Sequence, residues 1–97
     1  MRTYTFTVKD KSYTLRFTFN AIVELEEVIK KPITSFGDGA VGVKDIRAII
    51  YAGLKWENQG LTLDRVGYLL DDYVEESSLE ELITKAVELI SASIKSK

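Results

Sequence analysis

The stretch from Tyr13 to Ile29, YTLRFTFNAIVELEEVI, decides the fold because its hydrophobic period changes within it. In the first half apolar and polar residues alternate, which is typical of a half-buried strand. In the second half Ile22, Leu25 and Ile29 recur at a spacing that only a helix places on one face. The stretch therefore predicts a strand that passes directly into a helix, with Asn20 as the N-cap residue at the change.

A second alternating run precedes this stretch and predicts its partner strand. The polar segment from Lys9 to Lys11 separates the two runs, so residues 2–19 are expected to form an antiparallel β-hairpin. A two-stranded hairpin is not stable alone, so helices must cover its apolar face. That face is expected to hold Tyr4, Phe6, Val8, Tyr13, Leu15, Phe17 and Phe19.

Four helices are expected after the hairpin, at about residues 20–30, 43–56, 62–75 and 78–94. Thr62 is the predicted N-cap of the third helix, and Ser77 or Ser78 is expected to open the fourth, where Ser78-Leu79-Glu80-Glu81 fits a capping box. Three valines, at positions 28, 43 and 74, are assigned to buried faces, and Ile33 and Phe36 are expected to fold back onto the core. These elements predict one α+β domain over residues 1–97, with the hairpin packed on a helical bundle.

Two glycines lie inside predicted helices, where glycine costs about 1 kcal/mol relative to alanine. They are Gly53 and Gly67, each on or beside an apolar stripe. One interpretation is that the second and third helices cross closely at these positions, where a side chain would block contact. The alternative is that either glycine marks an early helix end.

The composition disfavours the common kinds of catalytic site. The 97 residues include no cysteine and no histidine, so thiolate chemistry and the commonest general base and metal ligand are absent. We therefore expect a protein that is not an enzyme and has no catalytic residue, cofactor or metal. No apolar run approaches the roughly 20 residues that span a bilayer, so a soluble, cytoplasmic protein without membrane contact is expected.

Charge is distributed unevenly along the chain. Residues 1–60 carry nine Lys or Arg and seven Asp or Glu, whereas residues 61–97 carry four and eight. The acidic second part disfavours nucleic acid as a partner and favours a basic protein. The candidate partner-binding residues are therefore acidic residues of the last two helices, together with an aromatic residue at the end of the second: Asp71, Asp72, Glu75, Glu76, Glu80 and Trp56.

Several short motifs together resemble a known family. They are Leu15-Arg16-Phe17-Thr18-Phe19-Asn20-Ala21, Leu25-Glu26, Pro32-Ile33, Ala52-Gly53-Leu54, Thr62 and Val66-Gly67. In this order the chain resembles the small tail assembly chaperones of phages and phage-derived gene transfer agents, over roughly residues 10–90. These motifs are hydrophobic and structural, and none is catalytic.

The resemblance implies a non-enzymatic role in the cytoplasm of a host bacterium. Such a factor holds the long helical tape-measure protein in solution while tail tube subunits polymerise around it, so the tape-measure protein is the expected partner and the tail tube protein a candidate second one. The alternative is a small regulatory or nucleic-acid-associated binding domain that uses cationic side chains: Lys44, Arg47, Lys55 and Arg65.

Overall fold

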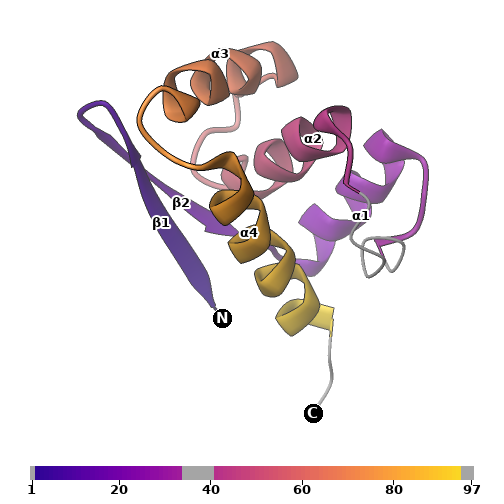
Figure 1. Cartoon of the computed structure of the whole chain (residues 1–97). Coiled ribbons are helices and arrows are strands. Elements are labelled where there is room, and N and C mark those ends of the chain that lie inside the picture. The colour runs from indigo at the N-terminus through magenta and orange to yellow at the C-terminus, as the bar shows by residue number, and fades with distance from the viewer. Residues whose placement is uncertain (1, 34–40, 95–97) are drawn as a thin grey trace.

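The computed structural model describes residues 2–33 and 41–94. The elements in chain order are β1 (Thr3–Val8), β2 (Lys11–Arg16), α1 (Phe19–Ile29), α2 (Val43–Leu54), α3 (Leu63–Val74) and α4 (Leu79–Ile94). The predicted α+β fold, an N-terminal hairpin followed by four helices, is confirmed. Figure 1 shows the hairpin at one margin of the molecule and the helices gathered beside it.

The hairpin pairs without interruption from Thr3 opposite Arg16 to Val8 opposite Lys11. Phe6 and Leu15 are buried on its inner face, where Phe6 stacks on the ring of Tyr13. The turn has no Asn-Gly or Asp-Gly pair. Instead, Lys9 takes the left-handed conformation, with φ 55°, which costs a residue with a side chain about 1 to 2 kcal/mol.

The change from strand to helix lies one or two residues earlier than the sequence predicts. Thr18 is the N-cap, because its hydroxyl accepts a hydrogen bond from the Ala21 amide at 3.0 Å, so the prediction for Asn20 is wrong. Phe17 is fully buried, as expected. Phe19, assigned to the same face, begins the helix and is 73% exposed, since the alternation of a strand no longer applies once the backbone turns helical.

The end of α1 is fixed by backbone and side-chain contacts. Lys30 follows α1 in the left-handed conformation and its amide donates to the Glu26 carbonyl. The Glu26 carboxylate accepts from the Ile33 amide at 2.7 Å, and Ile33 is buried as predicted. The Lys31 ammonium contacts the largely buried carboxylate of Asp45 at 2.6 Å, which joins the segment after α1 to the start of α2. The predicted packing of residue 36 lies outside the described residues.

The helical stripes are correct in the middle of each helix and wrong near several ends. Helix α2 ends at Leu54 instead of residue 56. Val28, Val43 and Val74 are exposed, although all three were assigned to buried faces. Thr62 caps α3 by accepting from the Arg65 amide, and the hydroxyl of Ser78 accepts from the Glu81 amide at the start of α4, as predicted.

The two helical glycines do not mark a close crossing of α2 and α3, so that interpretation is wrong. A Cβ atom on Gly53 would lie 2.7 Å from Cδ2 of Leu15 and 2.8 Å from Cζ of Phe17, both on the hairpin side. At Gly67 the nearest atom is Cδ of Arg47, at 3.7 Å, which is ordinary van der Waals contact. The glycine in α2 therefore serves packing against the strand, and the one in α3 leaves room for a side chain.

The core lies between the hairpin and the helices. Helix α2 contacts the other three helices and β2, while α3 and α4 contact β1. Tyr73 of α3 meets Phe6 edge to face, with ring centroids 5.6 Å apart. The largest fully buried side chains come from β2, from the junction that follows it and from all four helices: Phe17, Leu15, Leu25, Ile49, Ile50, Leu82 and Val66.

Candidate protein-binding surface

A shallow apolar groove lies where the start of α2, the second half of α3 and the start of α4 meet. Its first part is a depression of about 460 Å³. Val43 and Val74 lie in its wall, and Val43 is 79% exposed. The remaining lining comes from Lys44, Ile46, Arg47, Gly67, Leu70, Asp71 and Leu79.

The groove continues between α2 and α4 as a second depression of about 550 Å³. Ile46 and Leu79 line both depressions, so the two form one surface. The second part is lined by the apolar side chains of Val41, Ile83 and Val87 in addition, and its charged lining residues are Glu80 and Glu88. We call the two depressions together the apolar groove.

Wide apolar faces of the helices produce this surface. In α4 the residues Leu82, Ala86 and Ile90 are buried in the core. Beside them Leu79, Ile83 and Val87 follow one another at intervals of four and lie only partly buried, so α4 has a second apolar row that the core covers only in part. This double row is the signal in the sequence that predicts a groove, and assigning the apolar residues to one buried stripe per helix misses it.

The structure separates the six predicted partner-binding residues into different places. Asp71 lines the first part of the groove and Glu80 the second. Glu75 instead approaches the ammonium of Lys9 at 3.7 Å, toward the hairpin turn. Asp72 is partly buried on α3 and Glu76 is exposed after it, and neither lines the groove.

Trp56 lies against the hairpin, away from the groove. It is 41% exposed, and its indole N–H donates to the Thr14 carbonyl at 3.0 Å. The guanidinium of Arg16 lies over its ring, 5.2 Å from the centroid. These contacts give Trp56 a structural role in joining the end of α2 to β2.

The cationic residues of the alternative interpretation are also dispersed. Lys44 and Arg47 line the first part of the groove. Arg65 lines a separate depression near the hairpin turn, together with Lys11. Lys55 lies 4.0 Å from Glu24 and over the ring of Tyr51, and a hydrogen bond to Tyr51 followed by the charge of Glu24 raises its pKa above the usual value.

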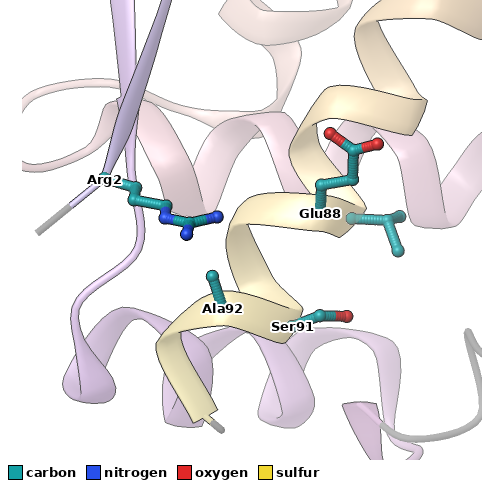
Figure 2. Close-up of a pocket in the computed structure, with 5 residues that line it drawn as sticks. Arg2, Glu88, Ser91 and Ala92 are labelled. Atoms are coloured by element: carbon teal, nitrogen blue, oxygen red, sulfur yellow. The ribbon is translucent and has the colours of Figure 1, made fainter.

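A further depression, of about 520 Å³, lies between the start of the chain, at Arg2, and α4. Figure 2 shows the Arg2 side chain extending from β1 toward α4, where Ala92 lies across from it. Glu88 and Ser91 project from the same helix. Glu88 also lines the groove, so one carboxylate borders both depressions.

Within residues 2–33 and 41–94 no three acidic side chains come together in a way that would hold a metal ion. In the same part of the chain, no helix combines the length and hydropathy needed to cross a membrane. Comparison of the chain with protein families, curated proteins and solved structures finds no significant match.

Proposed function

We propose that the protein is a non-catalytic tail assembly chaperone, of the kind that its sequence resembles, and that its apolar groove holds a helical segment of the tape-measure protein. The observation that carries the proposal is the exposure of apolar side chains from three helices on one continuous surface. Exposed apolar patches of this kind mark interaction sites in monomeric proteins.

The apolar lining fits one stripe of an amphipathic helix. Val43 and Ile46 of α2 and Leu79 of α4 supply apolar contacts from two elements. In helix-in-groove recognition, such contacts receive apolar residues of the partner helix that are spaced three and four apart. A long tape-measure protein exposes such stripes along its length until the tail tube encloses it. Covering them in the groove would suppress aggregation.

Charge favours a partner helix with basic residues beside its apolar stripe. Glu80 and Glu88 are the charged residues in the second part of the groove, and Asp71 lies in the first. Opposite charges across an interface speed encounter and fix orientation more than they raise affinity. Lys44 and Arg47 lie on the α2 side of the groove. The basic flank of a partner helix would therefore face α4 and not α2.

Co-expression with a candidate tape-measure protein, chosen as a long, helix-rich chain encoded by the same phage or host genome, tests the proposal. We expect the tape-measure protein to stay in the soluble fraction and to co-purify with the wild-type chain. Val43→Asp should reduce co-purification at least tenfold, by placing a charge in the apolar lining. The matched control is Val23→Asp, since Val23 is an exposed valine of α1 (42% exposed) that does not line the groove.

The fold should survive both substitutions. Val43 opens α2, where an added carboxylate interacts favourably with the helix dipole, and circular dichroism melts check this for each variant. Absence of co-purification with the wild-type chain would contradict the proposed function. Equal co-purification by the Val43 and Val23 variants would contradict the groove as its site.

A further inference from the structure

The two outer edges of the hairpin differ in how their backbone groups are used. On β2 the amide of Thr14 donates to the Glu57 carboxylate at 3.1 Å, and the Thr14 carbonyl accepts from Trp56. The residues that follow α2 therefore cover the edge of β2 at its centre. Such cover is one way in which proteins prevent an edge strand from pairing with another chain.

On β1, the backbone amides and carbonyls of alternate residues point toward the outer edge of the hairpin, away from β2. Thr5 lies opposite Thr14. Because the backbone groups of Thr14 point away from β1, those of Thr5 point away from β2, as in every non-hydrogen-bonded antiparallel pair. The alternation along the strand gives Thr3 and Thr7 the same orientation. Within the part of the chain that the structure describes, no group forms a hydrogen bond with the outward amides and carbonyls of these three threonines.

Strand β1 also lacks the features that discourage pairing at an edge. Its sequence, TYTFTV, contains no proline and no charged residue, and its pairing with β2 has no bulge. Threonine, tyrosine, phenylalanine and valine all favour strands. Natural edge strands carry lysine, proline or bulges where pairing must be avoided, so this edge is open to the addition of a strand.

We propose that β1 pairs antiparallel with β1 of a second copy of this chain, which joins the two hairpins into one four-stranded sheet. The sequence of the edge is self-complementary: a two-fold axis at Thr5 sets Thr5 opposite its own copy and Thr3 opposite Thr7. Each of these pairs presents its free amides and carbonyls to the other, so each exchanges two hydrogen bonds. The proposal does not depend on the proposed function.

The side chains suit this register on both faces. On the outer face threonine meets threonine, an arrangement already present within the hairpin, where the hydroxyls of Thr5 and Thr14 lie 2.9 Å apart. On the inner face Tyr4 would meet Phe6 of the second copy, an aromatic cross-strand pair. Because Thr3–Val8 carries no charge, the two copies approach without repulsion between like charges. A second copy is therefore the occupant that this edge fits.

Sedimentation equilibrium from low micromolar to near-millimolar concentration tests the pairing. We expect the wild-type chain to form a dimer, with amide exchange at Thr3, Thr5 and Thr7 slowing as the dimer forms. Thr5→Pro removes the central outward amide from both copies without removing a bond of the hairpin. It should raise the dimer Kd at least about tenfold, since the two lost bonds contribute roughly 1 kcal/mol each.

Thr5→Lys places a charge at the two-fold axis and should weaken the dimer similarly, and it decides the test if the proline variant fails to fold. Ser12→Lys is the matched control, because Ser12 lies on β2 opposite Thr7, at the other edge. A wild-type chain that stays monomeric throughout the series would overturn the proposal. So would a dimer that Thr5→Lys leaves intact, or one that Ser12→Lys weakens equally.

Discussion

Gly53 of α2 lies directly against the ring of Phe17, so that a Cβ atom at position 53 would be 2.8 Å from Cζ of the ring. Leu15 closes the other side at 2.7 Å. Both neighbours are fully buried, so neither can move aside without disturbing the core around it. Helix α2 therefore packs on the hairpin through a position where only glycine fits.

Gly53→Ala should destabilise the protein by about 1 to 2 kcal/mol. The added methyl group overpacks the site, at a cost of about 1 to 3 kcal/mol, and the better helix propensity of alanine returns about 1 kcal/mol at most. Urea unfolding followed by circular dichroism measures the difference. A variant as stable as the wild type would show that the core yields more easily than its burial indicates.

Gly67→Ala is expected to have the opposite effect. The nearest atom would lie 3.7 Å from the new Cβ atom and belongs to the side chain of Arg47, so the methyl group fits. Alanine in the interior of α3 should then stabilise the protein by up to about 1 kcal/mol. The same urea titration measures both variants, and comparing them separates a packing role of glycine from its general effect in a helix. A loss of stability in Gly67→Ala would contradict the conclusion that position 67 has room for a side chain.

Phe17→Asp should unfold the protein, whereas Phe19→Asp should leave it folded. Phe17 is fully buried at the junction of hairpin and helices, and a phenylalanine truncated at such a site already costs about 3 to 5 kcal/mol before any charge is buried. Phe19 lies two residues later at the exposed start of α1, where a carboxylate is favourable. Far-ultraviolet circular dichroism and thermal melts distinguish the two, and a native melt for the Phe17 variant would refute its role.

The contrast between Phe17 and Phe19 shows how far the sequence predicts this fold. The change of hydrophobic period correctly places a strand before a helix, because the two periods depend on backbone geometry alone. It cannot place the boundary to the residue, because Thr18 and Asn20 are both good N-caps and the choice depends on how the hairpin enters the helical layer. The packing role of Gly53 could not be predicted from the sequence either, because its neighbours Leu15 and Phe17 lie almost forty residues earlier in the chain.

The candidate surface was less predictable than the fold. The charge distribution pointed to acidic side chains after residue 60, and Asp71 and Glu80 do line the groove. Trp56 could not be placed, because its partners on β2 become neighbours only when α2 packs on the hairpin. Hydrophobic periodicity predicts burial for several lining residues, Val43 and Val74 among them, because it does not show whether another element covers a second row of apolar side chains.

Lys30→Gly should stabilise the protein by about 0.5 to 1 kcal/mol. Lys30 follows the last residue of α1 with φ 60° and ψ 38°, the left-handed position that glycine usually occupies after a helix. Glycine removes the steric cost of a side chain there, which is about 1 to 2 kcal/mol, but loses more conformational entropy on folding. Thermal denaturation measures the gain. Lys30→Ala is the control, because it removes the same charge while keeping the Cβ atom, and it should not stabilise.

Stability at alkaline pH should depend on Tyr73. Burial, followed by the charges of Tyr4 and Glu81, raises the pKa of Tyr73 above its usual 10.0. Because the folded state holds the phenolic proton more tightly than the unfolded state, this contribution to stability is complete below about pH 10 and is lost as the pH rises through the folded pKa. Tyr73→Phe keeps the edge contact with Phe6 and removes the ionisable group.

The free energy of unfolding of Tyr73→Phe should therefore fall less steeply than that of the wild type between about pH 9 and 11. Near neutral pH, where the phenol keeps its proton in both the folded and the unfolded state, the variant should unfold in the same way as the wild type, because the ring still packs against Phe6. Urea titrations at several pH values measure the difference. Tyr68→Phe removes a hydroxyl from a ring that is 70% exposed and serves as the control; parallel pH profiles for the wild type and the Tyr73 variant would show that the buried phenol does not govern alkaline unfolding.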